Sequence, residues 1–278
     1  MVIHKSNKFK VFFKLTFPSQ KIYLYVTGNK WTMPQTGFPM KILPLISVLA
    51  ISFAAIAHIS TAEEKAATDT LIVAELFTSQ GCSSCPPAEK LFSNLADRDD
   101  LITLEWHVDY WDKLVHGGSR WKDVYSSREF TNRQREYNQA LRGRRAVYTP
   151  QAIVNGRVEG VGSRRGEVSD LLKYSGKLKV PVHIDSNTVS VGKSSESADI
   201  LFVRLLKKHV TNVKGGENKG RKLSGKNIVL EATVLGQTGA ENAEFTLPSI
   251  GEGESCAVLV QSLHGKQVGP ILGAAKCG

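Results

Sequence analysis

The feature that most constrains the fold is a pair of cysteines, Cys82 and Cys85, that separates an apolar run from an amphipathic one. Residues 71–77 are almost continuously apolar, which is typical of a strand buried on both faces. In residues 86–97 the apolar side chains recur at helical spacing and predict a helix. Residues 101–108 predict a second strand. The order strand, CxxC, helix, strand indicates a parallel pair joined by a right-handed crossover.

The cysteines lie at the N-terminus of the predicted helix, and this position favours thiol–disulfide exchange. Free backbone N–H groups and the helix dipole stabilise a thiolate there. We expect Cys82, normally the more exposed of such a pair, to attack and Cys85 to resolve the mixed disulfide. A purely structural bridge is a weaker interpretation, because a CxxC loop is short and its closure contributes little chain entropy.

Two nearby side chains leave alternatives open. His107, in the second predicted strand, could complete a copper or zinc site with Cys82 and Cys85. Glu75 lies within the apolar first strand. It either sits beneath the disulfide, with its pKa raised by burial, and relays protons to Cys85, or faces water at a strand edge.

Downstream residues complete one α/β domain. Residues 127–142 predict a helix, and residues 148–154 lead into a third strand. The dipeptide Asn155-Gly156 predicts a hairpin turn that returns through residues 157–161. Ser163 is a candidate N-cap for a last helix.

This succession of elements resembles the thioredoxin fold over residues 70–176. More narrowly, the chain is similar to an exported thioredoxin-like family of unknown function (domain of unknown function 1223). The matching motifs are residues 75–89 around the CxxC, residues 107–112, residues 148–151, Asn155-Gly156 and the glycine-rich residues 216–227. The resemblance implies a central mixed sheet flanked by helices and a capacity for redox chemistry, without a particular substrate.

The resemblance also implies a role for Thr149 and Pro150. Thioredoxin-like proteins place a cis-proline at the start of the strand that faces the CxxC, and cis bonds are nearly confined to X–Pro. The Thr149 backbone could then bind the extended chain of a substrate as an added strand. An ordinary trans proline at a strand edge is the alternative. Pro86 and Pro87 depart from thioredoxin and remove N–H donors near the cysteines, which argues against a strong oxidase.

From residue 180 the pattern changes to short strand-like runs separated by turn residues. This predicts a small all-β, sandwich-like domain over residues 180–278. The glycine- and lysine-rich residues 214–226 indicate a solvated hairpin connection. Cys256 and Cys277 form an even pair, for which we expect a structural disulfide worth about 3 kcal/mol in the chain-entropy model.

The N-terminal region predicts export. A lysine, an apolar run over residues 42–57 and small residues near position 62 define a signal peptide over residues 40–62. An uncleaved membrane anchor is the alternative. Residues 1–39 form a doubtful extension: translation starts at Met40 or Met33, or the basic, aromatic segment lies on a membrane. A periplasmic or secreted protein is therefore expected.

Charge excludes one class of partner. The formal net charge is +10, but residues 1–62 hold seven lysines and no acid, so the remainder carries only +3. Nucleic-acid binding needs a sustained basic face, which the remainder lacks. The expected partners are protein thiols or disulfides, with membrane contact only through the signal segment or anchor, and no cofactor besides the redox-active disulfide. The sequence thus predicts an exported thiol–disulfide oxidoreductase or isomerase. The alternative is a periplasmic binding protein on the same scaffold, with copper bound through the CxxC and His107.

Overall fold

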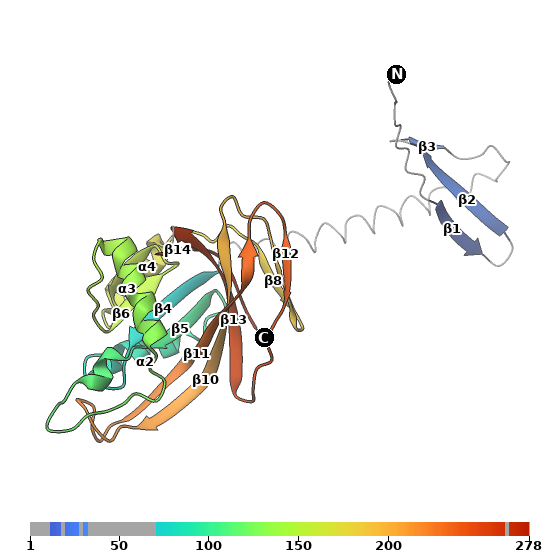
Figure 1. Cartoon of the computed structure of the whole chain (residues 1–278). Coiled ribbons are helices and arrows are strands. Elements are labelled where there is room, and N and C mark those ends of the chain that lie inside the picture. Colours follow the sequence, from blue (N-terminus) through green and yellow to red (C-terminus); the bar gives the residue numbers. More distant parts are fainter. Residues whose placement is uncertain (1–11, 18–19, 28–29, 33–70, 265–266, 278) are drawn as a thin grey trace. The chain divides into compact units, whose positions relative to one another are not determined.

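The chain divides into two compact units, residues 1–58 and 59–278. The computed structural model describes residues 12–17, 20–27, 30–32, 71–264 and 267–277 (Figure 1). In the first unit an antiparallel sheet consists of β1 (Phe12–Phe17), β2 (Gln20–Thr27) and β3 (Lys30–Thr32). The predicted signal segment lies outside the described residues. Among those described, no helix has the length and apolar character needed to cross a bilayer.

The elements around the cysteines confirm the predicted order. They are β4 (Ile72–Thr78), α2 (Pro86–Leu95) and β5 (Leu101–His107). β4 and β5 pair in parallel. α2 begins directly at Pro86, with Cys85 as its N-cap residue. A proline suits this first helical position, because its fixed φ is already helical and its missing N–H would have no partner within the helix.

The next elements confirm the predicted helices and hairpin. They are the short 3₁₀ helix η1 (Tyr110–Lys113), α3 (Arg128–Arg142), β6 (Gln151–Val154), β7 (Val158–Val161) and α4 (Arg165–Tyr174). Ser127 caps α3, since its side chain accepts a hydrogen bond from the N–H of Glu129. The predicted cap of α4 at Ser163 is wrong: the N-cap residue is Arg164, and its side chain makes no capping bond.

The C-terminal part is not confirmed as a separate all-β domain. Its strands are β8 (Val182–Asp185), β9 (Thr188–Val191), β10 (Ala198–Asn212), β11 (Lys222–Thr238), β12 (Ala243–Thr246), β13 (Glu254–His264) and β14 (Gln267–Lys276). β11 pairs in parallel with β5, so β10, β11, β13 and β14 extend the central sheet. The sheet has eight strands in the order β14-β13-β10-β11-β5-β4-β6-β7, and β12-β9-β8 form a separate small sheet.

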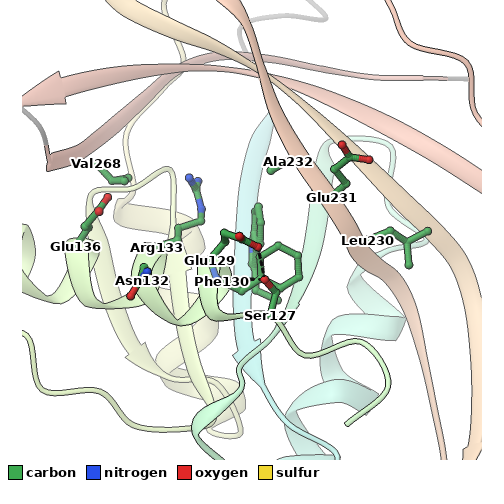
Figure 2. Close-up of a pocket in the computed structure, with 11 residues that line it drawn as sticks. Ser127, Glu129, Phe130, Asn132, Arg133, Glu136, Leu230, Glu231, Ala232 and Val268 are labelled. Carbon is green, nitrogen blue, oxygen red and sulfur yellow. Dashed lines mark hydrogen bonds between the residues drawn. The ribbon is translucent and has the colours of Figure 1, made fainter.

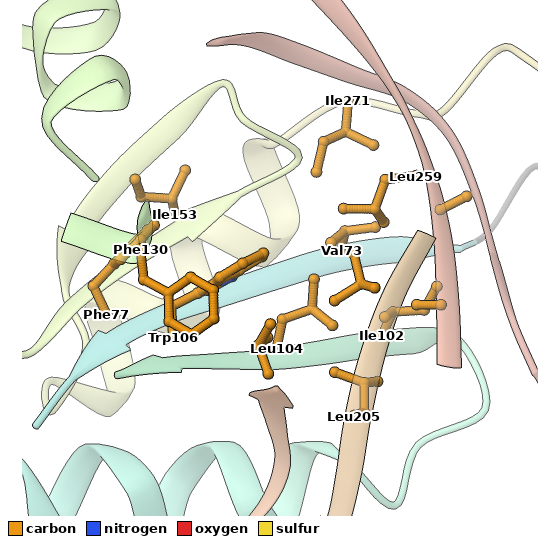
Figure 3. Close-up of a cluster of buried hydrophobic side chains, with 14 of the residues drawn as sticks. Val73, Phe77, Ile102, Leu104, Trp106, Phe130, Ile153, Leu205, Leu259 and Ile271 are labelled. Carbon is orange, nitrogen blue, oxygen red and sulfur yellow. The ribbon is translucent and has the colours of Figure 1, made fainter. Parts of the chain in front are cut away.

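Strand alternation separates the core into layers. Val73 and Phe77 of β4 pack with α3 on one face, in a cluster that continues through Trp106 into β10 and β13 (Figure 3). Ala74 and Leu76 of β4 pack with α2 and α4 on the other face. A third cluster joins the small sheet to β10 and β13. The cysteine motif thus belongs to the α2 face of a mixed α/β sheet.

Candidate functional site

Cys82 and Cys85 form a disulfide between the end of β4 and the first turn of α2, with their Cα atoms 5.4 Å apart. The N–H groups of Ala88 and Glu89 donate to the Cys85 carbonyl oxygen at 2.8 and 3.1 Å. The hydroxyl of Ser84 lies 3.3 Å from the Cys82 sulfur. The tight turn therefore holds both sulfurs at the helix N-terminus, where the sequence predicted them.

The expectation that Cys82 is exposed is wrong. Both cysteines are 0% exposed, although Ser83 and Ser84 between them are exposed. The physical reason is that the β10–β11 loop (residues 213–221) closes over the turn instead of extending into water. The Asn218 side chain is itself buried and donates to the carbonyl oxygen of Cys82 at 2.8 Å.

Several polar contacts hold the β10–β11 loop in this position. The Asn218 amide also donates to the carbonyl oxygen of Gln80 at 3.0 Å, while Arg221 donates to its oxygen and orients it. The Glu217 carboxylate accepts the Ser83 N–H at 2.8 Å. This hydrogen bond makes the largest contribution to lowering the pKa of Glu217, and the nearby His116 ring also lowers it.

A small cavity of about 190 Å³ opens beside the disulfide turn. It is lined by Gly81, Trp111, Leu114, Val115, His116, Trp121, Gly216 and Glu217. Leu114 and Val115 are 50% and 57% exposed, so two neighbouring aliphatic side chains present apolar surface there. The cavity therefore offers an apolar wall next to the cysteine motif.

Thr149 and Pro150 lie at the same edge of the sheet as the disulfide. Phe77 near the end of β4 pairs with Gln151 at the start of β6, so the residues after β4 and before β6 meet there. The Thr149–Pro150 peptide bond is cis, as the resemblance implies. The Trp111 indole N–H donates to the Thr149 hydroxyl at 2.7 Å, and the Trp111 side chain also packs on Gly81. Trp111 therefore links the segment before β6 to the turn that holds the disulfide.

Glu75 is fully buried but is not placed beneath the disulfide. Strand alternation turns it toward α3, where Arg133 pairs with its carboxylate at 2.8 Å and the Tyr137 hydroxyl donates at 2.5 Å. The buried acid on α2 is Glu89, which accepts a hydrogen bond from Thr78 at 2.7 Å. The pKa of Glu89 is raised, mainly by burial, although His107 and the hydrogen bond from Thr78 lower it in part.

His107 is also buried, and it binds Asp123 instead of sulfur in this structure. Its Nδ1 lies 2.7 Å from the Asp123 carboxylate, which also accepts the Gln80 N–H at 2.7 Å. Burial is the largest influence on the pKa of His107 and would lower it, but the carboxylates of Asp123, Glu89 and Asp112 together outweigh burial and raise that pKa. Among the described residues, the ligand cluster that includes His107 contains Glu105 and His209 and neither cysteine.

Sequence reasoning missed Glu105, Asp123, His209 and Asn218. Glu105 could have been predicted from the sequence, because it precedes His107 by two residues and therefore lies on the same face of the strand. Burial and the charge of Glu89 raise the pKa of Glu105 well above its ordinary value. The pKa of His209 is lowered to about 4, mainly by burial. The other residues reach the site through contacts between distant segments.

A larger cavity of about 580 Å³ lies between α3 and the strands β11 and β14, on the α3 face (Figure 2). Arg133 lines it together with Glu129, Glu136 and Glu231. None of the site residues predicted from sequence lines this cavity. The disulfide and its surroundings are therefore the candidate functional site.

Comparison with known proteins supports the architecture and names no activity. A family model described as "Protein of unknown function (DUF1223)" matches residues 73–261. The chain is similar to the crystal structure of protein AGR_C_4864 from Agrobacterium tumefaciens, with 32% sequence identity and a TM-score of 0.63. The match covers 74% of this chain and 93% of that chain. No curated protein matches.

Proposed function

This chain belongs to the family of proteins of unknown function DUF1223, and from the geometry of its disulfide we propose that it is a thioredoxin-like thiol–disulfide oxidoreductase or isomerase. The observation that carries the proposal is the Cys82–Cys85 disulfide at the N-terminus of α2, on the sheet edge shared with Thr149 and Pro150. A structural disulfide gains most when it closes a long loop, whereas this one spans a sequence separation of 3.

The proposed chemistry is reversible exchange between this pair and a protein dithiol. In the oxidised form a substrate thiolate attacks the Cys82 sulfur, a mixed disulfide forms and Cys85 leaves as a thiolate. A second substrate thiolate then attacks the substrate sulfur and releases Cys82, so that the substrate is oxidised by two electrons and the pair is reduced. In the reverse direction Cys82 attacks and Cys85 resolves.

The surroundings of the disulfide suit a polypeptide substrate. Leu114 and Val115 present apolar surface beside the turn, and apolar side chains of an unfolded or extended segment would pack there. Thr149, at the start of β6, is the proposed backbone contact for that segment. Export to an oxidising compartment also remains our proposal, based on the sequence of residues 40–62 and on two disulfides.

Because both sulfurs are buried, exchange requires the β10–β11 loop to move. Asn218→Ala removes the donor to the Cys82 and Gln80 carbonyl oxygens, so we expect a small phosphine to reduce this disulfide severalfold faster. Lys219→Ala, a change of an exposed side chain in the same loop, is the matched control and should react like the wild type. Equal rates for all three proteins would contradict the shielding role of the loop.

The decisive experiment traps the mixed disulfide. The Cys85→Ser variant, incubated with a disulfide-bonded protein such as insulin, should accumulate a covalent adduct through Cys82. Cys82→Ser should form little adduct, and the wild type should catalyse insulin reduction by dithiothreitol. The double variant Cys256→Ser/Cys277→Ser is the control and should keep the activity, because its disulfide joins β13 to the C-terminal tail. The absence of both adduct and turnover in folded protein would overturn the proposal.

The burial of both cysteines favours a second candidate, a binding protein on the same scaffold. In that case the disulfide would only shape the turn below the 190 Å³ cavity. The Cys82→Ser/Cys85→Ser variant would then retain binding of an extended, apolar peptide with unchanged affinity, while no exchange would be detected in the wild type.

A further inference from the structure

Three side chains that could bind a metal converge on one face of the central sheet. Glu105 and His107 lie two residues apart on β5 and therefore on one face, and His209 comes from β10. The ligand atoms of all three lie within 4.8 Å of one another. Glu105 and His107 are 0% exposed and His209 is 5% exposed. The cluster is thus separate from the Cys82–Cys85 sulfurs and closed to bulk water.

The inward-facing atoms of this cluster have no partner. Both carboxylate oxygens of Glu105 and the Nε2 atoms of His107 and His209 are buried, and none of the described residues forms a hydrogen bond with them. The N–H of Lys226 favours the charged form of Glu105 without reaching hydrogen-bond geometry. Buried polar groups are nearly always satisfied, so four orphaned atoms on the three residues of one cluster require an explanation. One cation accepting their lone pairs would satisfy them together.

The opposite nitrogens of the two rings are already bound. His107 Nδ1 contacts the Asp123 carboxylate at 2.7 Å, and His209 Nδ1 lies 3.4 Å from the Thr211 hydroxyl. In metal sites the second ring nitrogen typically binds a carboxylate or another polar group, which fixes the ring and aims the first nitrogen at the ion. This arrangement therefore orients both Nε2 atoms as ligands.

Because Gly225 has no side chain, the Glu105 and His209 side chains can occupy the space beside it. It pairs with His209 across the β10–β11 ladder. A Cβ atom at this position would lie 2.5 Å from a Glu105 carboxylate oxygen and 2.8 Å from His209 Nε2. Any larger residue would displace both groups, so the backbone here accommodates this cluster.

We propose that Glu105, His107 and His209 bind one divalent transition-metal ion, with Zn²⁺ as the first candidate. Two imidazoles and one carboxylate are a donor set that zinc and its neighbours in the first transition row accept. Three protein ligands leave a position for a water molecule. The site uses His107 but neither cysteine, so it is independent of the disulfide exchange proposed above.

Binding of Zn²⁺ itself tests the site. The purified protein, stripped with a chelator and titrated with Zn²⁺, should bind one ion per chain and unfold at a higher temperature with zinc than without it. Glu105→Gln and His209→Gln should each weaken binding at least about tenfold and lose the shift in unfolding temperature. His116→Gln, which changes a histidine with an exposed side chain, is the matched control and should bind as the wild type does.

Further readouts separate this site from the cysteines and from folding defects. The Cys82→Ser/Cys85→Ser variant should still bind one Zn²⁺, and the Co²⁺ form should lack a sulfur-to-metal charge-transfer band. Gly225→Ala retains every ligand and should still weaken binding. The proposal is overturned if the folded wild type binds no zinc, if the Gln variants bind as tightly, or if binding disappears with the cysteines.

Discussion

The Glu75 carboxylate is fully buried, and three groups contribute to its environment. Arg133 and Tyr137 contact it directly, while Gln261 accepts a hydrogen bond from Arg133 and donates one to the Tyr137 hydroxyl. Burial is the largest influence on the pKa of Arg133 and would lower it, but Glu75, Tyr137 and Glu136 together outweigh burial and raise that pKa. The network ties β4, α3 and β13 together on the face opposite α2. It therefore belongs to stability and not to exchange at the cysteines.

Glu75→Gln tests that separation of roles. Breaking a buried ion pair leaves Arg133 with an uncompensated charge, so we expect a loss of about 3 kcal/mol in the free energy of unfolding, measured in urea. The rate of exchange by the folded variant should not change. Glu241→Gln, at an exposed position, controls for charge. A lower exchange rate with unchanged stability would instead support the proton relay predicted from sequence.

At the scale of elements, the β10–β11 loop is the part that covers the disulfide turn. The Glu217 carboxylate favours the closed loop when it is charged, because it accepts the Ser83 N–H. Its pKa is lowered in the folded state, so this stabilisation is complete above the ordinary pKa of a glutamate. It is lost as the pH falls through the lowered pKa.

We therefore expect reduction of the Cys82–Cys85 disulfide by a phosphine to accelerate between neutral pH and about pH 3, relative to a small-molecule disulfide. Glu217→Gln should be fast and nearly independent of pH across this range. His116 is the other titratable group that faces Glu217, at 3.7 Å, and His116→Gln should keep the acid acceleration. An unchanged pH profile in Glu217→Gln would contradict the assignment.

The second disulfide stabilises a different pair of elements. Cys256 and Cys277 are bonded, as the even cysteine count predicted, and the bridge closes the end of the β13–β14 pairing. Replacing both by serine should lower the free energy of unfolding by about 3 kcal/mol, because the bridge restricts the unfolded chain. Denaturant unfolding measures this loss. A change below about 1 kcal/mol would show that the strand pairing alone fixes the C-terminus.

Local elements were predictable where one short segment carries the whole signal. β4, α2 and α3 show their period within a few turns or alternations, and Asn155-Gly156 marks its hairpin. β10 and β11 were predicted as short strands because polar and glycine residues interrupt their apolar pattern beyond Leu206 and before Asn227. β14, with Gly269, Pro270 and Gly273, has no alternation to detect.

The site was predictable only in its local part. The disulfide follows from a spacing of three residues, but His209 meets Glu105 only through the register of long strands. Asn218 lies in a glycine- and lysine-rich segment whose composition indicates solvent, and its burial depends on contacts with Gln80 and Cys82. Composition cannot reveal a contact between segments more than a hundred residues apart.

At the scale of the whole molecule, one eight-stranded sheet contains strands from both domains predicted from the sequence, residues 70–176 and 180–278. Ile228 of β11 pairs with Glu105 of β5, and buried side chains of β10 and β13 belong to the same core cluster as α3. A chain that ends near residue 176 would leave β5 with an unpaired edge and an uncovered apolar face.

We predict that the protein unfolds in a single calorimetric transition apart from residues 1–58, and that a chain truncated after residue 176 does not fold alone. Calorimetry and hydrogen exchange of both proteins measure this. A truncated chain with a cooperative transition of its own would favour the two domains predicted from sequence. Separate transitions in the full chain would lead to the same conclusion.

The two strands that carry the β10–β11 loop pair only with each other in their last residues before the loop. Residues 208–212 of β10 pair with residues 222–226 of β11, beyond the last residues that pair with β13 and β5. The two strands satisfy each other's backbone groups there. His209 and Leu223 of this segment are buried, so it can stay in place while the β10–β11 loop at its tip moves and loses side-chain hydrogen bonds worth about 1 kcal/mol each. Under the exchange that we propose, the opening of this loop alone would admit a substrate thiol to the sulfurs.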